Sequence, residues 1–449
     1  MYQHVVKDSK SSVTEQAEWG WLLENINQRN WVGFREDFQE DVLQIVEQKK
    51  KAFNERLTAL SSAPSRAERR EMVSRMREMY RLTASCFASP LWQSPPVWGP
   101  QESGRYVELF VDDYRRESSL EMKKYEAELY SVFYKETFHE DGGSLLVSSG
   151  ASALSLALDY FRMRFGGNFT TAIPLEIYHG SSELTDISSP LREGISMKKV
   201  DVRCVEVSTN AREILSPCFA TLLEQARESN EFVLIDATNR PLSQSELQQI
   251  RSHKEVPVLI LESLLKLHQY GLELTNAGCL TYVGPKKEEV IGSLNWLRAR
   301  NGTSISDYGV YALPPLCKSQ FQGRVERVLA ANKALLTAMA ELTGESFGGE
   351  HFEYAQLKFN WSQSPFVSVS YAQSEKSFDD LKNFFLRVKR NLREVGADMI
   401  EGASYGFQQS RMYLHYPFSK FAEPWMRISV GAEPQYEVEL IAEALILSC

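Results

Sequence analysis

From residue 143 onward, short apolar segments alternate with stretches of helical periodicity, and this alternation constrains the fold more than any other feature. The segments 144–149, 232–236, 256–262 and 278–284 are short, apolar and bounded by polar or glycine residues, which is typical of buried strands. Helical spacing follows the first of them at 150–165. Strands that alternate with helices predict an α/β fold with a mainly parallel sheet covered by helices.

The N-terminal part has a different pattern. Residues 41–60 place apolar side chains three and four apart on a charged background, and 67–80 do the same, so we expect two amphipathic helices. The proline-rich stretch 89–100 cannot be helical, because each proline removes a backbone donor and fixes φ. We therefore expect a helical N-terminal extension over 1–95 that packs within its own dimer, with the recruitment of another protein as the alternative.

The C-terminal part repeats strand and helix patterns on a smaller scale. A long helical stretch at 321–342 leads into strand-like segments at 367–371 and 426–430, with helical periodicity at 376–395 between them. We therefore expect the extension to be followed by two domains, a large one over 96–310 and a small α/β domain over 311–449.

Charge and cysteine content exclude several classes of protein. The chain has 449 residues with 50 basic and 59 acidic side chains, a net charge of −9, which does not favour an electrostatic nucleic-acid binder. No apolar window is long enough to span a membrane, and the N-terminus lacks a signal-peptide pattern. Six dispersed cysteines without a CxxC pair predict free thiols rather than a metal site. We therefore expect a cytoplasmic protein without metal, nucleic-acid or membrane partners.

A turn of small residues follows the first predicted strand, at the edge where open α/β sheets bind ligands. Ser149, Gly150 and Ala151 stand between this strand and the next helix. Backbone N–H groups at a helix N-terminus attract an anion. A serine N-cap explains the same residues and, taken alone, is the better explanation.

Three charged residues stand at or on other predicted strands. Asp236 ends an apolar strand, where a carboxylate is costly without a partner such as a helix cap, a protonated ring nitrogen or, less favourably, a metal. Lys266 follows the next strand, where desolvation lowers the pKa of an amine, although a solvated lysine is the simpler interpretation. Arg427 shares a strand face with Ser429 and suits carboxylate capture, or else lies on a solvent-exposed face.

The order of these features resembles the fold-type I pyridoxal-phosphate enzymes, and more narrowly the Cys/Met metabolism family of cystathionine γ-synthase and γ-lyase. The resemblance extends from Arg105 to the C-terminus. Further matches are Tyr114-Arg115-Arg116 to the family's Tyr-Ser-Arg, Ser149-Gly150-Ala151 to Ser-Gly-Met, Tyr178-His179-Gly180 to Tyr-Gly-Gly, the stretch Glu206 to Asn210 to Glu-Thr-Pro-Thr-Asn, Ser404-Tyr405-Gly406 to Ser-Leu-Gly, and Arg427 to Gly431 to Arg-(Leu/Ile)-Ser-Val-Gly.

The resemblance implies a large domain with a mainly parallel seven-stranded sheet and pyridoxal 5'-phosphate as cofactor. Lys266 would form the Schiff base and act as general base, Asp236 would bond the ring nitrogen, and Tyr178 would stack on the ring. The other implied cofactor contacts are Tyr114 and Arg116 from a neighbouring subunit, Ser149, Gly150, Ala151, Asn210, Thr238 and Ser263. Arg427 and Ser404 would bind the substrate carboxylate.

The implied activity is γ-elimination or γ-replacement on a γ-substituted amino acid such as a homoserine ester, cystathionine or S-adenosylmethionine. The alternatives are a β-lyase, an aminotransferase, or a non-catalytic protein of the same fold. Leu265 supports the last of these, because the family has threonine before the lysine. The subunit-crossing contacts imply a homodimer or a dimer of dimers.

Overall fold

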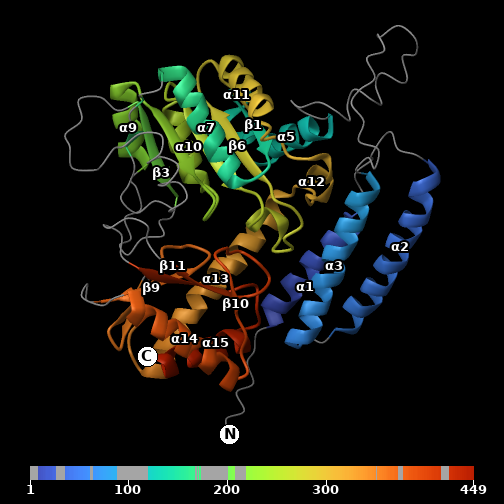
Figure 1. Ribbon diagram of the computed structural model, residues 1–449, viewed down its shortest axis with the longest axis vertical. Coiled ribbons are helices and arrows are strands. Elements are labelled where there is room, and N and C mark those ends of the chain that lie inside the picture. The colour runs from blue at the N-terminus through green and yellow to red at the C-terminus, as the bar shows by residue number, and fades with distance from the viewer. Residues whose placement is uncertain are drawn as a thin grey trace.

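The computed structural model describes residues 9–26, 36–60, 64–87, 120–166, 169, 171–172, 201–207, 219–349, 351–372, 378–415 and 424–449. Two mixed sheets with their helices lie one above the other, and three N-terminal helices stand beside both of them (Figure 1). The long helix α13 (Lys318–Thr343) leads from the first sheet to the second.

The first sheet has the strand order β1-β6-β5-β4-β3-β2. Strands β2 to β5 are parallel, and β6 is antiparallel to both of its neighbours, β1 and β5. The expected mainly parallel sheet is therefore confirmed, with six strands in the described part of the chain where seven were expected. These strands are β1 (Gly142–Val147), β2 (Thr171–Ala172), β3 (Val202–Glu206), β4 (Phe232–Asp236), β5 (Val258–Ser263) and β6 (Gly278–Val283).

The reversed direction of β6 goes with the lack of an α-helix in the connection before it. A parallel neighbour needs a crossover connection, usually a helix that packs on the sheet. The connection from β5 to β6 contains only the 3-10 turn η1 (Leu267–Gln269). As a result, the carboxyl ends of β1, β3, β4 and β5 and the start of β6 meet at one edge of the sheet.

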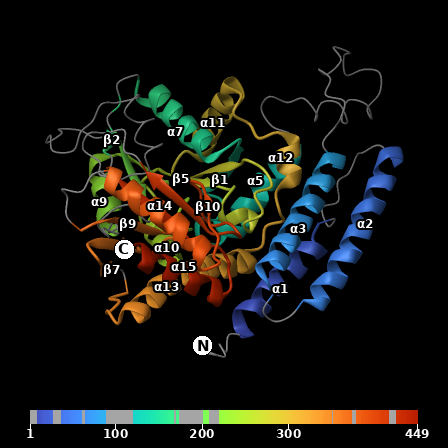
Figure 2. The same ribbon diagram turned by 60° about the horizontal axis from the view of Figure 1, so that its bottom comes forward.

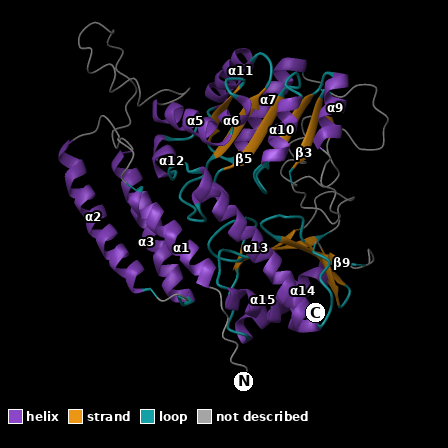
Figure 3. Cartoon of the chain, turned by 180° about the vertical axis from the view of Figure 1, so that it is seen from behind, coloured by secondary structure: helices purple, strands orange, loops and turns teal. Residues whose placement is uncertain are grey.

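Both faces of this sheet are covered, which explains why its strands are apolar throughout. Alternate strand residues such as Val233 and Ile235 pack against one group of helices, and their neighbours such as Leu234 pack against another. Figure 3 shows the strands enclosed between these layers. The first group is α5 (Leu120–Phe133), α6 (Lys135–Phe138), α9 (Phe219–Ser229), α10 (Gln244–Ser252) and α12 (Asp307–Ala312), and the second is α7 (Gly150–Phe165) and α11 (Lys287–Asn301).

The second sheet has the order β10-β11-β12-β9-β8-β7 and one apolar face. Met426 and Ile428 of its central strand pack with α13, α14 and α15, whereas Arg427 and Ser429 point to the opposite face. Its elements are β7 (His351–Tyr354), β8 (Leu357–Asn360), β9 (Val367–Tyr371), β10 (Ile400–Glu401), β11 (Arg411–His415), β12 (Trp425–Ser429), α14 (Phe378–Glu394) and α15 (Gln435–Ser448).

The described residues of the N-terminal part form three helices, of which the sequence predicted two. These are α1 (Ser9–Glu24), α2 (Glu36–Ala59) and α3 (Arg66–Phe87), which lie side by side in two views (Figures 1 and 2). Their apolar faces enclose Trp19 and Phe53 together with Leu272 and Tyr311 from the first-sheet unit, so the helices pack on their own chain. Among the described residues, no helix is long and apolar enough to cross a membrane.

Candidate active site

The ends of β4 and β5 are tied together at the shared edge of the first sheet. The Ser263 backbone N–H donates to Thr238 Oγ1 at 3.0 Å, and the Ala237 N–H donates to the Leu261 carbonyl at 2.8 Å. These bonds fix the turns that carry Asp236 and Lys266 relative to each other. The structure thus brings together predicted site residues that lie on separate strands.

The predicted phosphate turn lies beside Ser263. Ser149 is the N-cap of α7, and its hydroxyl accepts the Ser152 N–H at 3.0 Å, as the capping interpretation required. A Cβ atom on Gly150 would stand 2.9 Å from the Ser263 Cβ, so only glycine allows this close approach. The N–H groups that open α7, with the hydroxyls of Ser149 and Ser263, form a donor set suited to a phosphate. Ala151 is exposed in the first turn of the helix.

Asp236 is a half-buried carboxylate at the carboxyl end of β4. It accepts the Thr238 backbone N–H at 2.9 Å. Burial raises the pKa of Asp236, and the hydrogen bonds from Thr238 and the positive charge of Lys266 oppose this rise. A protonated ring nitrogen placed beside the carboxylate would stabilise its charged form in the same way.

Lys266 follows β5 and opens η1, so its side chain stands at the same edge. Burial and, to a smaller extent, the positive charge of Arg427 lower the pKa of Lys266, which lies at about 7. The negative charges of Asp236 and Glu206 act in the opposite direction. Lys266 is half-buried, which favours a partly desolvated amine over the simple interpretation of a solvated lysine.

Arg427 reaches the same place from the second sheet. It is buried, with 3% of its surface exposed. The alternative that Arg427 lies on a solvent-exposed strand face is therefore excluded. Its Nη1 donates to the Ala403 carbonyl at 2.6 Å. Its guanidinium lies 4.6 to 5.1 Å from three ring centres, those of Phe366, Trp425 and Tyr405. Ser404, the second residue predicted to bind a carboxylate, is half-buried beside this contact.

Tyr405 was part of a sequence match but was not predicted as a site residue. Its ring lies under the Lys266 ammonium, with the Nζ atom 3.7 Å from the ring centre, and its hydroxyl donates to Asn239 after β4. One feature of the sequence could have indicated this role: Tyr405 is an aromatic residue at the position where the family's Ser-Leu-Gly has leucine. Glu206, which ends β3 next to Asp236, is a second residue that belongs to a sequence match but had no predicted role.

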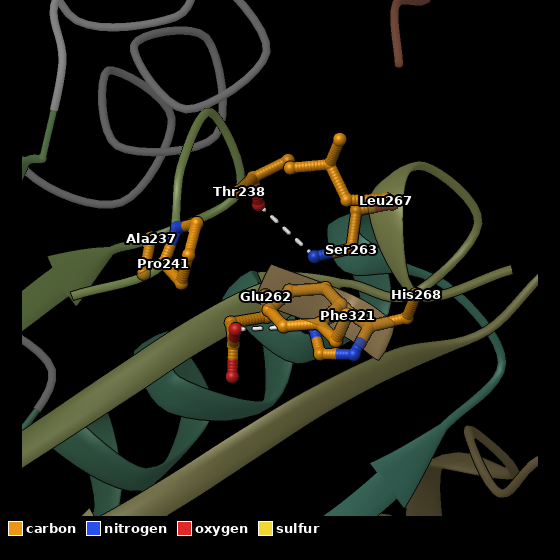
Figure 4. A pocket seen from close by; sticks show the side chains of 8 residues that line it. All are labelled: Ala237, Thr238, Pro241, Glu262, Ser263, Leu267, His268 and Phe321. Carbon is orange, nitrogen blue, oxygen red and sulfur yellow. Dashed lines mark hydrogen bonds and ion pairs between the residues drawn. The ribbon is translucent and has the colours of Figure 1, made fainter. Parts of the chain in front are cut away.

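A small cavity opens behind the ends of β4 and β5 (Figure 4). Within it the Glu262 carboxylate accepts the Tyr134 hydroxyl at 2.6 Å and lies 3.2 Å from His268 Nε2, while His268 stacks on Phe321. This polar group is buried under the lysine turn. Its lining residues are Ala237, Thr238, Pro241, Glu262, Ser263, Leu267, His268 and Phe321.

Four predicted contacts lie outside the described residues. These are Tyr114, Arg116, Tyr178 and Asn210. The structure therefore brings Asp236, Lys266 and Arg427 together without testing the stacking tyrosine, the ring-hydroxyl contact or the residues expected from a neighbouring subunit.

Comparison with curated proteins finds a similarity to part of this chain. No family model matches the sequence. A protein of Aspergillus flavus described as bifunctional enzyme flvA is 26% identical over 191 residues, which cover 42% of this chain. The matched stretch spans only 22% of the length of that protein.

Solved structures share the fold over most of the chain. A cystathionine gamma-lyase from Micromonospora echinospora has a TM-score of 0.55 at 14% identity and covers 80% of this chain and 93% of its own. A cystathionine gamma synthase from Xanthomonas oryzae pv. oryzae, in complex with cystathionine, has a TM-score of 0.54 at 15% identity, with 79% and 91% covered. A putative O-acetylhomoserine (thiol)-lyase from Campylobacter jejuni, solved with N'-pyridoxyl-lysine-5'-monophosphate, has a TM-score of 0.52 at 13% identity, with 82% and 99% covered.

These neighbours are fold-type I pyridoxal-phosphate enzymes of the Cys/Met metabolism family, and the chain has their fold. The fold expected from the sequence is thereby confirmed.

Proposed function

We propose that this protein is a pyridoxal-phosphate-dependent enzyme that eliminates or replaces the γ-substituent of an amino acid. The observation that carries the proposal is the meeting of Lys266, Asp236 and Arg427 at one edge of the first sheet, with electrostatic coupling of the lysine to both other residues. The shared fold with cystathionine gamma-lyase and gamma synthase structures supports the reaction class.

The residues present fit the cofactor. Its phosphate needs several N–H or O–H donors, which the start of α7, Ser149 and Ser263 supply beside the close approach at Gly150. Its ring nitrogen needs a carboxylate, which Asp236 supplies, and its aldehyde needs a neutral amine, which Lys266 supplies. Leu265 stands where the family has threonine, but Ser263 still supplies a hydroxyl in this turn. The substitution therefore removes none of the groups named above.

Each residue then has a defined task. Bound pyridoxal phosphate supplies an electron sink for the substrate Cα. Asp236 would keep the proton on the ring nitrogen. Lys266, whose pKa lies near neutrality, would accept the proton from Cα, pass it on, and then accept one from Cβ, so that the γ-substituent leaves with its bonding electron pair. Arg427 binds the substrate carboxylate with Ser404, and its contacts with Ala403 and the surrounding rings hold the guanidinium in place.

The remaining assignments extend this proposal to residues outside the described part. Tyr178 would stack on the cofactor ring and Asn210 would bond its hydroxyl, while Tyr114 and Arg116 would reach the phosphate of a partner subunit in a homodimer. The proposal also includes the division of the chain into an N-terminal extension over 1–95, a large domain over 96–310 and a small domain over 311–449. Mixing Arg116→Ala with Lys266→Ala tests the shared site, because hybrid dimers would regain one intact site. No activity in hybrids that form would contradict it.

Borohydride reduction tests the proposed attachment. Protein saturated with pyridoxal phosphate is reduced and digested, and the modified peptide is mapped by mass. We expect the added mass on Lys266 and none in Lys266→Ala. An unmodified Lys266 in saturated wild-type protein would end the proposal.

Product masses from a substrate panel then define the reaction. O-acyl-homoserine, cystathionine and S-adenosylmethionine are incubated with the holoenzyme, beside β-substituted amino acids and a 2-oxo-acid acceptor. We expect products that have lost the γ-substituent. Turnover of the β-substituted substrates alone would instead identify a β-lyase, and a new amino acid made only with the acceptor would identify an aminotransferase.

A further inference from the structure

The N-terminal helices contact the candidate active site through a buried charge. Glu18 of α1 is fully buried and pairs with two arginines of α13: its Oε1 lies 3.7 Å from Arg324 Nη1, and its other oxygen accepts a hydrogen bond from Arg327. Arg324 is also fully buried. A buried arginine is tolerated only with a counter-charge, and here the counter-charge comes from the extension.

Arg324 in turn contacts the two loops that carry Lys266 and Tyr405. We call residues 264–275 the lysine loop and residues 403–408 the tyrosine loop. Arg324 Nη2 donates to the Gly406 carbonyl at 3.1 Å, next to Tyr405. A Cβ atom on Gly271 would stand 2.5 Å from the same nitrogen, so the guanidinium is pressed against both loops. Burial lowers the pKa of Arg324 to about 10, which still leaves it charged at neutral pH.

The lysine loop and the tyrosine loop also contact each other directly beside Arg324. A Cβ atom on Gly406 would lie 3.0 Å from the Leu267 side chain, directly after Lys266. Gln408 Nε2 donates to the Tyr270 carbonyl at 3.1 Å. A shift of Arg324 would therefore move the ring of Tyr405 relative to the amine that lies over it.

We propose that Glu18 is a positioning residue for the candidate active site, acting through Arg324 to hold the lysine loop and the tyrosine loop together. The extension is then a structural part of the site. The role in catalysis rests on the proposed function, whereas the positioning itself does not require a cofactor.

A matched pair of variants separates this role from general stability. Glu15 and Arg69 form a second buried ion pair, with N–O distances of 2.8 and 3.2 Å, that joins α1 to α3 without touching either loop. Glu18→Gln and Glu15→Gln each remove one buried negative charge from the same helix. Only the first removes the carboxylate that pairs with Arg324 and Arg327, whereas Glu15 acts on Arg324 more weakly.

The experiment is amide hydrogen exchange, read by mass spectrometry, on cofactor-free protein. We expect exchange in both loops to rise about tenfold in Glu18→Gln and to stay within about twofold of wild type in Glu15→Gln. In the same Glu18→Gln sample, the pH of half-labelling of Lys266 by an amine reagent should shift, since its contact with Tyr405 changes. Unchanged loops in folded Glu18→Gln, or an equal rise in both variants, would overturn the proposal.

A milder variant covers the case in which Glu18→Gln does not fold. Glu18→Asp keeps the charge and shortens its reach by one methylene, and we expect roughly threefold faster exchange in the two loops. Wild-type exchange in this variant would also overturn the proposal. None of these outcomes depends on borohydride labelling, so a failed cofactor attachment and a failed positioning role remain distinguishable.

Discussion

The amine of Lys266 lies 3.7 Å from the centre of the Tyr405 ring, although the two residues belong to the units of different sheets. The Tyr405 hydroxyl reaches back to Asn239 beside β4, so the ring is held from both units. A cation over an aromatic face is stabilised by about 0.5 to 2 kcal/mol. Tyr405 therefore opposes the burial and the Arg427 charge that remove the proton from Lys266.

Replacing Tyr405 tests this balance. In Tyr405→Leu the ring is lost, so we expect the pKa of Lys266 to fall by about half a unit to one unit. Tyr405→Phe keeps the ring and loses only the bond to Asn239, so its pKa should stay close to that of wild type. The pH dependence of amine labelling at Lys266, measured in cofactor-free protein, gives both values. Equal pKa values in Tyr405→Leu and wild type would show that the ring does not stabilise the ammonium.

The lowered pKa of Lys266 predicts a pH profile in the wild-type protein. Labelling of this amine should rise through about pH 7 in the folded chain and through about 10.5, the ordinary lysine value, after denaturation. Between these values the unfolded chain binds a proton that the folded chain does not bind. The contribution of Lys266 to stability therefore increases as the pH rises through this window and is lost as the pH falls. A folded-state midpoint near 10 would contradict the burial argument.

Gly150→Ala tests the phosphate turn. The new Cβ would stand 2.9 Å from the Ser263 Cβ and force the turn and the strand end apart. We expect pyridoxal-phosphate affinity, measured by absorbance titration, to fall about tenfold, the equivalent of one lost hydrogen bond to a charged group. Gly292→Ala in α11 is the control, because its Cβ meets no atom within 4 Å. Its affinity should be unchanged, and its helix should gain about 1 kcal/mol of stability. Equal affinities in the two variants would exclude the turn as the phosphate site.

Arg427→Lys tests carboxylate binding. Lysine keeps the positive charge near Lys266 but cannot offer two parallel N–H donors. We expect KM for the amino-acid substrate to rise about tenfold or more, with the affinity for pyridoxal phosphate unchanged. Arg203→Lys is the control, since Arg203 also lies on a strand and pairs bidentately, but with Glu231. A KM that stays at the wild-type value in Arg427→Lys would show that another group binds the carboxylate.

Local patterns explain why several elements were predicted closely. The helix at 150–165 and the strands at 232–236 and 367–371 have the observed bounds, because apolar periodicity and the flanking residues act within a few positions. The direction of β6 was not predicted, since it depends on whether the connection crosses over the sheet rather than on the strand itself.

The sequence by itself determined the order of strands and helices and the polar residues at strand ends, because both are written in short-range patterns of apolar and polar side chains. Only the tertiary structure decided that Arg427 is buried, that the ring of Tyr405 lies under Lys266, and that Glu18 neutralises Arg324. Burial and charge pairing depend on which distant segments exclude water from a side chain. That information arises when the two sheets and the N-terminal helices pack together.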